Sequence, residues 1–195
     1  MIDVPCLLDE GTKNFLSSIA DKTFENICCV EVGCFLGGSL CHFGQKITTK
    51  GIKNFYLYAV DNWGFGNISE GHMQMVNREV GYYEQFLDNV KKCGLDSFVE
   101  PMRMDSIYAA KHFGRESIDF LFIDGDHTYP YVKEELLEWL PKMKKNSILA
   151  GHDYSSSADI RLAAHEILEP KYEIQFTENR DSYYIQIGEG LCQYQ

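Results

Sequence analysis

Apolar segments that favour strands alternate with amphipathic helical patterns along most of this chain, and this order is the strongest constraint on its fold. Short runs rich in β-branched and aromatic residues predict strands. They are residues 26–32, 55–60, 97–102, 118–123, 147–150, 172–176 and 183–187. Between strands, apolar residues at helical spacing predict helices, as at Tyr83, Phe86, Leu87 and Val90. Such alternation is typical of a mostly parallel sheet with helices on both faces.

Two further helical stripes are predicted in the second half of the chain, and both indicate faces buried in the core. Their members are Val132, Leu136, Leu140 and Met143 in the first stripe, and Ile160, Ala163, Ala164 and Ile167 in the second. Pro141 lies close to the end of the first helix and would shorten or kink it.

The last two predicted strands differ from the others, because the turn-rich residues 178–181 leave no room for a helix between them. We therefore expect a C-terminal antiparallel hairpin. The predicted fold class is α/β, with a doubly wound, mostly parallel sheet of seven strands. The 195 residues predict one domain, 1–195. A stretch rich in glycine and aromatic residues at about 63–80 is either a lid insertion or a surface excursion.

Polar residues follow five of the predicted strands at the point where each strand ends. The clearest case is the apolar run 118–123, which leads into Asp124, Gly125, Asp126 and His127. The carboxyl ends of parallel strands meet at one edge of an open α/β sheet, where ligands bind. Taken alone, this run could equally be an Asx-Gly turn that caps the next helix.

The loop after the first strand contains Gly33 and Gly37, which permit a tight turn and a close approach of the backbone to a ligand. The helix after it would offer free N–H groups to a carboxylate or another anion. A dinucleotide-binding loop has the pattern Gly-x-Gly-x-x-Gly, and here Phe35 stands in place of the second glycine. A nicotinamide-dependent α/β oxidoreductase is therefore the weaker alternative.

The remaining strand ends supply further polar groups. Asp61 ends the second strand, where a carboxylate can accept both hydroxyls of a ribose. Asp105 and Ser106 follow the third strand, at a place suited to an adenine edge. His152 and Asp153 follow the fifth strand. We expect these strand ends to build one site.

Together these motifs resemble the small S-adenosylmethionine-dependent methyltransferases, and most of all the macrocin O-methyltransferase type related to catechol O-methyltransferase. In chain order the motifs are Glu31-x-Gly33-x-x-x-Gly37-x-Ser39, Val60-Asp61-x-Trp63, Phe122-Ile123-Asp124-Gly125-Asp126-His127-x-Tyr129 and Gly151-His152-Asp153-Tyr154. The likeness extends from about residue 26 to residue 187. It implies the Rossmann-like methyltransferase fold and methyl transfer to a hydroxyl of a small molecule, such as a sugar.

The resemblance also implies which residues bind S-adenosylmethionine. The glycines would line its methionine part with Glu31 beneath the loop, Asp61 would hold the ribose hydroxyls, and residues 105–106 would lie beside the adenine. The complete set expected to bind the cofactor is Glu31, Gly33, Gly37, Ser39, Asp61, Asp105, Ser106 and Asp124.

A divalent cation, Mg²⁺ or a similar ion, is implied at Asp124 and Asp153, with Asp126 as a further ligand. In catechol-type enzymes an Asn follows the metal-binding Asp of the fifth strand, whereas here Tyr154 follows Asp153. His127 matches a position proposed as general base in sugar-modifying relatives, so His127 and Asp124 are the expected catalytic residues. Such a cation would stabilise the developing alkoxide, and an imidazole can take its proton near neutral pH.

Each of these residues also has a structural alternative. Asp124 could cap the next helix, Asp126 suits a turn or a cap better than a metal ligand, and His127 could orient a carboxylate. His152 is expected to be structural. A non-catalytic S-adenosylmethionine-binding module is the second alternative function.

Composition limits the partners and the compartment. A formal net charge of −11 disfavours a surface that follows nucleic-acid phosphates. The seven cysteines form no Cys-x-x-Cys pair, which indicates free thiols in a reducing compartment. No apolar run has the length of a transmembrane helix. We expect a cytoplasmic protein, able to form a homo-oligomer, that binds a small-molecule hydroxyl acceptor and neither nucleic acid nor membrane.

Overall fold

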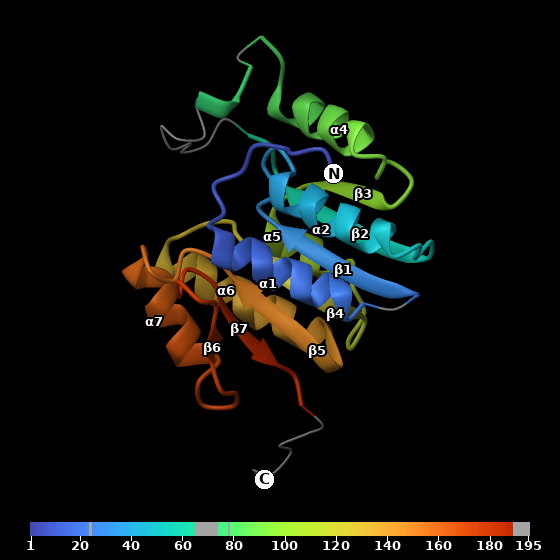
Figure 1. Cartoon of the computed structure of the whole chain (residues 1–195). Helices are drawn as coiled ribbons and strands as arrows, with labels where there is room; N and C mark the ends of the chain where they lie inside the picture. The colour runs from blue at the N-terminus through green and yellow to red at the C-terminus, as the bar shows by residue number, and fades with distance from the viewer. Residues whose placement is uncertain (24, 65–73, 78, 189–195) are drawn as a thin grey trace.

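The computed structural model describes residues 1–23, 25–64, 74–77 and 79–188, and within them seven strands form one sheet (Figure 1). The strands are β1 (Ile27–Val32), β2 (Phe55–Asp61), β3 (Val99–Arg103), β4 (Ile118–Ile123), β5 (Met143–Gly151), β6 (Gln175–Phe176) and β7 (Tyr183–Gln186). Their order is β3-β2-β1-β4-β5-β7-β6. Strands β1 to β5 are parallel, and β7 runs antiparallel between β5 and β6. The predicted fold class is therefore confirmed.

Helices cover both faces of the sheet. One layer contains α1 (Glu10–Asp21), α2 (Gly38–Thr49) and α4 (Tyr82–Lys92), and the other contains α5 (Ser106–Ala110), α6 (Tyr129–Trp139) and α7 (Ala158–Ile167). In Figure 1, α1 and α2 lie in front of the sheet and α6 lies behind it. Strand β4 serves both layers, because Phe120 and Phe122 join one core cluster while Leu121 and Ile123 join the other.

Two element predictions are wrong in detail. Met143 is predicted on a helix but begins β5, because α6 ends at Trp139 and a short 3₁₀ turn, Leu140–Lys142, follows it. Pro141 in that turn has no N–H with which to continue an α-helix. The strand expected at 172–176 shortens to two residues, since the amide of Tyr172 still donates to the carbonyl of Leu168 at the end of α7.

Helix α1 has no counterpart among the predicted elements. Asp9 begins it, accepting hydrogen bonds from the amides of Gly11 and Thr12. Its apolar residues then bury one face of the helix beside α2. Of the stretch predicted as a lid, residues 65–73 and 78 lie outside the described residues.

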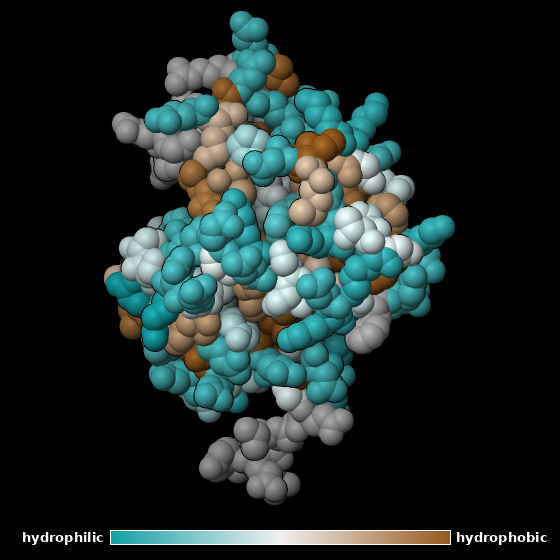
Figure 2. Space-filling model, in the orientation of Figure 1, coloured by the Kyte–Doolittle hydropathy of each residue, from teal (hydrophilic) through white to brown (hydrophobic). Residues whose placement is uncertain are grey.

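The surface visible in Figure 2 is largely hydrophilic, with apolar side chains in separate patches. Among the described residues, no helix has the length and apolar character needed to cross a membrane. The described cysteines, which exclude Cys192, are all free thiols.

Candidate active site

The carboxyl ends of the parallel strands lie side by side at one edge of the sheet. Val32 pairs in register with both Val60 and Ile123, and Ile123 pairs in turn with Gly151. The loops that follow β1, β2, β4 and β5 therefore begin next to one another. The sequence prediction that these strand ends meet agrees with this register.

The loop after β1 packs directly on the loop after β4. The amide of Gly33 donates to the carbonyl of Val60 at 2.9 Å, and Gly33 has a φ of +83°. A Cβ at this position would lie 2.0 Å from the carbonyl oxygen of Asp124. Gly37, with a φ of +82°, directly precedes α2, and no side chain caps that helix. The first turn of α2 therefore keeps its N–H groups for other acceptors.

Asp61 holds this loop from the end of β2. Its two carboxylate oxygens accept the amides of Phe35 and Trp63 at 2.8 and 2.7 Å, and the Trp63 indole N–H donates to the carbonyl of Phe35 at 2.7 Å. Phe35 and Trp63 both have positive φ angles, 46° and 45°. Phe35 thus takes a backbone conformation usually left to glycine. Because each carboxylate oxygen has two lone pairs, Asp61 keeps capacity for further donors.

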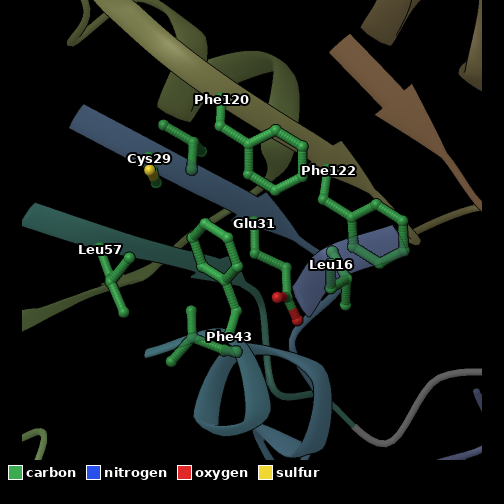
Figure 3. A pocket seen from close by; sticks show the side chains of 9 residues that line it. Leu16, Cys29, Glu31, Phe43, Leu57, Phe120 and Phe122 are labelled. Carbon is green, nitrogen blue, oxygen red and sulfur yellow. The ribbon is translucent and has the colours of Figure 1, made fainter. Parts of the chain in front are cut away.

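Glu31 and Ser39 lie beneath the loop rather than at its surface. Both are buried, and the Ser39 hydroxyl donates to the Glu31 carboxylate. Figure 3 shows that carboxylate in a small cavity among apolar side chains that include Leu16, Phe43 and Phe122. Burial raises the pKa of Glu31 to about 8. The pair therefore supports the loop from the core.

The two residues expected beside an adenine have different surroundings. Asp105 is half-buried, caps α5 and accepts a hydrogen bond from the Tyr131 hydroxyl. Ser106 is buried, and its hydroxyl accepts the indole N–H of Trp139 at 2.9 Å. Of the two, Asp105 alone presents a partly exposed side chain at the end of β3.

Two aspartates and a histidine form the centre of the site. His152 Nδ1 lies 3.3 Å from Asp124 Oδ1 and 3.3 Å from Asp153 Oδ2. One ligand atom from each of these three residues lies within 4.8 Å of the other two. His127 Nε2 lies 3.1 Å from Asp153 Oδ2. Carboxylate oxygens and an imidazole nitrogen at such separations fit a divalent cation.

The charges of this cluster are strongly coupled. Burial lowers the pKa of His152, but its hydrogen bonds with Asp124 and Asp153 outweigh burial and raise that pKa to about 11. Hydrogen bonds from His127 and then His152 hold the pKa of Asp153 well below its usual range. The hydrogen bond with Asp153 raises the pKa of His127. Each carboxylate and imidazole of the cluster thus favours the charged form of its neighbour.

The structure leaves Asp126 out of this cluster. Its Oδ1 accepts hydrogen bonds from the amide and the hydroxyl of Thr128, the residue directly before α6. This geometry matches the turn alternative, and a metal-binding role for Asp126 stays a prediction. His152, expected to be structural, instead lies at the centre of the cluster and is only 6% exposed. Its position directly before Asp153 at a strand end is the sequence signal that could have identified it.

A family model described as a methyltransferase domain matches residues 30–154. The chain belongs to this methyltransferase family. The matched range begins in β1 and ends directly after Asp153, so it contains all the strand ends described above. The resemblance to S-adenosylmethionine-dependent methyltransferases is confirmed, and the nicotinamide-dependent oxidoreductase is the wrong alternative.

One curated relative of this methyltransferase is an uncharacterised protein, y4gI, from Sinorhizobium fredii, which is 26% identical over 126 residues. The matched segment is 64% of this chain but only 13% of the relative, so this chain spans a small part of that protein.

Several solved structures share the fold of this methyltransferase. A precorrin-8W decarboxylase from Methanobacterium thermoautotrophicum is 17% identical, with a TM-score of 0.65 and 97% of both chains covered. An O-methyltransferase from Bacillus cereus in complex with S-adenosylhomocysteine is 12% identical, with a TM-score of 0.60 over 95% of this chain and 84% of that one. TomG from Streptomyces achromogenes, an O-methyltransferase in complex with S-adenosylmethionine, is 12% identical, with a TM-score of 0.64 and coverages of 94% and 82%. At these low identities, the TM-scores show a common fold and nothing further.

Proposed function

We propose that this methyltransferase transfers the methyl group of S-adenosylmethionine to a hydroxyl of a small molecule, such as a sugar, with the help of a divalent cation. The observation that carries the proposal is the cluster of Asp124, His127, His152 and Asp153 beside the loop held by Asp61. O-methyltransferases among the similar structures support the choice of an oxygen acceptor.

The cofactor would lie over the loop between β1 and α2. Gly33 and Gly37 allow the tight, left-handed turns of that loop, and the uncapped N-terminus of α2 suits the carboxylate of the methionine part. Asp61 would accept the ribose hydroxyls with the lone pairs that its two amide hydrogen bonds leave. Asp105 would face the adenine.

The chemistry requires the acceptor oxygen to lie in line with the methyl group and to lose its proton. His127 suits the base, because its imidazole is half exposed and Asp153 orients it through Nε2. Asp124 and Asp153 would hold the cation, which when bound lowers the pKa of the acceptor hydroxyl and stabilises its negative charge. Asp126 has no part in this proposal, because its Oδ1 accepts hydrogen bonds from Thr128 and the group of residues that could hold a cation here is Asp124, His152 and Asp153.

Calorimetry with S-adenosylmethionine tests the cofactor assignment. We expect the wild type to bind and Asp61→Ala to bind at least about tenfold more weakly, since it loses the ribose contact and the support of the loop. Asp96→Ala, an exposed residue in the segment before β3, is the matched control and should bind as the wild type does. Thermal unfolding of each variant shows whether it is folded. A wild type that does not bind, or an Asp61→Ala variant that binds undiminished, would disprove the assignment.

Removal of the cation tests the metal assignment. We expect EDTA to abolish methyl transfer and Asp153→Ala to lower kcat by about 10²-fold or more, because both remove stabilisation of the acceptor oxygen. Asp126→Asn is the control, and its dependence on the cation should match that of the wild type. Full turnover in EDTA would refute the role of the cation and leave the cofactor assignment intact.

A non-catalytic module is distinguished by a methyl-transfer assay over a panel of sugars, phenols and other alcohols. Transfer to any of them, lost in His127→Ala, supports catalysis. Binding of S-adenosylmethionine without transfer to any acceptor in the panel would favour the module.

A further inference from the structure

We propose that His152 is itself a ligand of the cation, through Nδ1, and that Asp124, His152 and Asp153 together favour a first-row transition ion such as Mn²⁺ or Co²⁺ over Mg²⁺. This inference rests on the metal part of the proposed function. It adds a nitrogen ligand and a metal preference that two aspartates alone would not give.

The position of Nδ1 supports its role as a ligand. It lies equally far, 3.3 Å, from an oxygen of Asp124 and an oxygen of Asp153, on the side of the ring that faces both carboxylates. The imidazole is buried and its neighbours hold it, so this nitrogen already points at the place where the carboxylates converge. A cation shared by the two aspartates would therefore also meet Nδ1.

The opposite side of the ring faces another carboxylate. His152 Nε2 lies 3.3 Å from Asp181 Oδ2, and the other oxygen of Asp181 accepts the Ser155 hydroxyl. Histidines that bind metals commonly donate their second ring N–H to a carboxylate, which fixes the tautomer and makes the ligand nitrogen more basic. Asp181 lies on the side of the ring where such a carboxylate would lie, and the buried Nε2, which makes no hydrogen bond in this structure, is available to donate to it when Nδ1 binds a cation.

Asp9 also lies near His152 and Asp181, but its carboxylate is engaged elsewhere. It accepts the amides of Gly11 and Thr12, the Thr12 hydroxyl and the side-chain amide of Asn179. The group formed by Asp9, His152 and Asp181 is therefore explained by a helix cap next to the outer carboxylate, and it needs no second cation.

The ligand types set the preference among ions. Mg²⁺ strongly prefers oxygen ligands in a near-ideal octahedron, whereas imidazole nitrogen suits first-row transition ions. Two carboxylate oxygens with one imidazole nitrogen thus disfavour Mg²⁺ relative to Mn²⁺ and Co²⁺. Substitution of the imidazole by a carboxylate should shift the preference back toward Mg²⁺.

Pulsed electron paramagnetic resonance of the whole chain with Mn²⁺ tests whether a nitrogen binds the ion. We expect electron spin-echo modulation from a coordinated imidazole nitrogen in the wild type, and its loss in His152→Asp. His127→Gln should keep the modulation, which separates the two neighbouring histidines. His112→Gln, an exposed position outside the cluster, is the matched control. Modulation that is absent from the wild type, or that is lost in His127→Gln and kept in His152→Asp, overturns the proposal.

Calorimetric titration with each ion tests the preference. We expect Mn²⁺ to bind the wild type at least about tenfold more tightly than Mg²⁺, and that ratio to fall in His152→Asp. Asp181→Asn keeps all three ligands and should weaken Mn²⁺ binding about 10- to 100-fold while the nitrogen modulation persists. This variant also tests the proposal if His152→Asp fails to fold. Equal affinity for Mn²⁺ and Mg²⁺ would contradict the preference.

The same samples, titrated with S-adenosylmethionine in EDTA, separate this inference from the proposed function. Cofactor binding without any Mn²⁺ binding would overturn the ligand set alone. Failure to bind the cofactor would instead contradict the function proposed above.

Discussion

At the scale of a single residue, Gly33 allows the loop after β1 to pack directly against the loop after β4. Its left-handed backbone and its contact with the carbonyl of Asp124 leave no space for a side chain. Gly51 offers a natural comparison, because it has a similar φ of +76° but no neighbouring atom within 4 Å of the place that a Cβ would occupy. The pair separates the cost of backbone conformation from the cost of a steric clash.

We predict that Gly33→Ala lowers the free energy of unfolding by about 3–5 kcal/mol, since the loops after β1 and β4 must move apart. Gly51→Ala should cost only about 1–2 kcal/mol, the penalty for a side chain in the left-handed region. Urea unfolding of both variants measures the difference. Equal losses would show that the contact with Asp124 has no energetic weight.

Glu135 is a second residue whose surroundings dominate its behaviour. It lies on α6, fully buried near Gly125, and burial raises its pKa from 4.5 to about 8. Between these pH values the folded protein holds a proton that the unfolded chain has released. The stabilising contribution is therefore complete below pH 4.5 and is lost as the pH rises toward 8.

We predict that Glu135→Gln, which cannot ionise, removes this loss. Relative to the variant, the wild type should lose on the order of 2–4 kcal/mol of unfolding free energy between pH 5 and pH 8. Glu134→Gln, at an exposed neighbouring position, should leave the pH dependence unchanged. Chemical denaturation at several pH values measures the three slopes, and parallel curves for wild type and Glu135→Gln would contradict the prediction.

At the scale of elements, α1 and the C-terminal hairpin are tied together although they lie at opposite ends of the chain. Asp9 caps α1 and also accepts the side-chain amide of Asn179 in the hairpin turn. One turn later, the hydroxyls of Thr12 and Ser182 lie 2.9 Å apart in the interior. The first helix and the turn of the C-terminal hairpin therefore stabilise each other.

We predict that Asp9→Ala lowers the free energy of unfolding by about 2 kcal/mol, which is more than the loss of an ordinary helix cap. The variant removes both the hydrogen bonds to the amides of α1 and the hydrogen bond from Asn179. Ser157→Ala is the matched cap variant, since the Ser157 hydroxyl accepts one amide of α7, that of Ile160, and its other contact, with the carbonyl of His127, is long at 3.5 Å. It should cost about 1 kcal/mol. Thermal unfolding of both compares them, and an Asp9→Ala loss no larger than that of Ser157→Ala would refute the added contribution.

Most of the strands can be predicted, because buried parallel strands appear in the sequence as short, continuous apolar runs. The wrong predictions fall where tertiary contacts decide. Met143 continues a helical stripe in the sequence, yet its side chain is buried as the first residue of β5. Helix α1 is not predicted, because its sequence is mostly polar and contains few apolar residues. These residues form a narrow face that is buried only when the helix packs on α2 and the sheet.

At the scale of the whole molecule, the location of the site can be predicted, whereas its internal contacts cannot. Parallel topology alone brings Asp61, Asp124 and Asp153 to one edge. Which carboxylate faces which nitrogen depends on neighbours that are distant in sequence. His152 is an example: from the sequence it is expected to be structural. Its neighbour Asp181 lies in the C-terminal hairpin, and no local sequence pattern predicts that this hairpin lies beside β5.

The antiparallel direction of β7 gives that hairpin an unusual position. Tyr183, the first residue of β7, pairs with Gly151 at the end of β5, so the turn before β7 reaches the same edge as the parallel strand ends. A turn can change its length or composition without altering the register of the sheet behind it. Evolution could therefore remodel one wall of the site through these few residues, and a protein engineer seeking a different acceptor could exchange the same turn first.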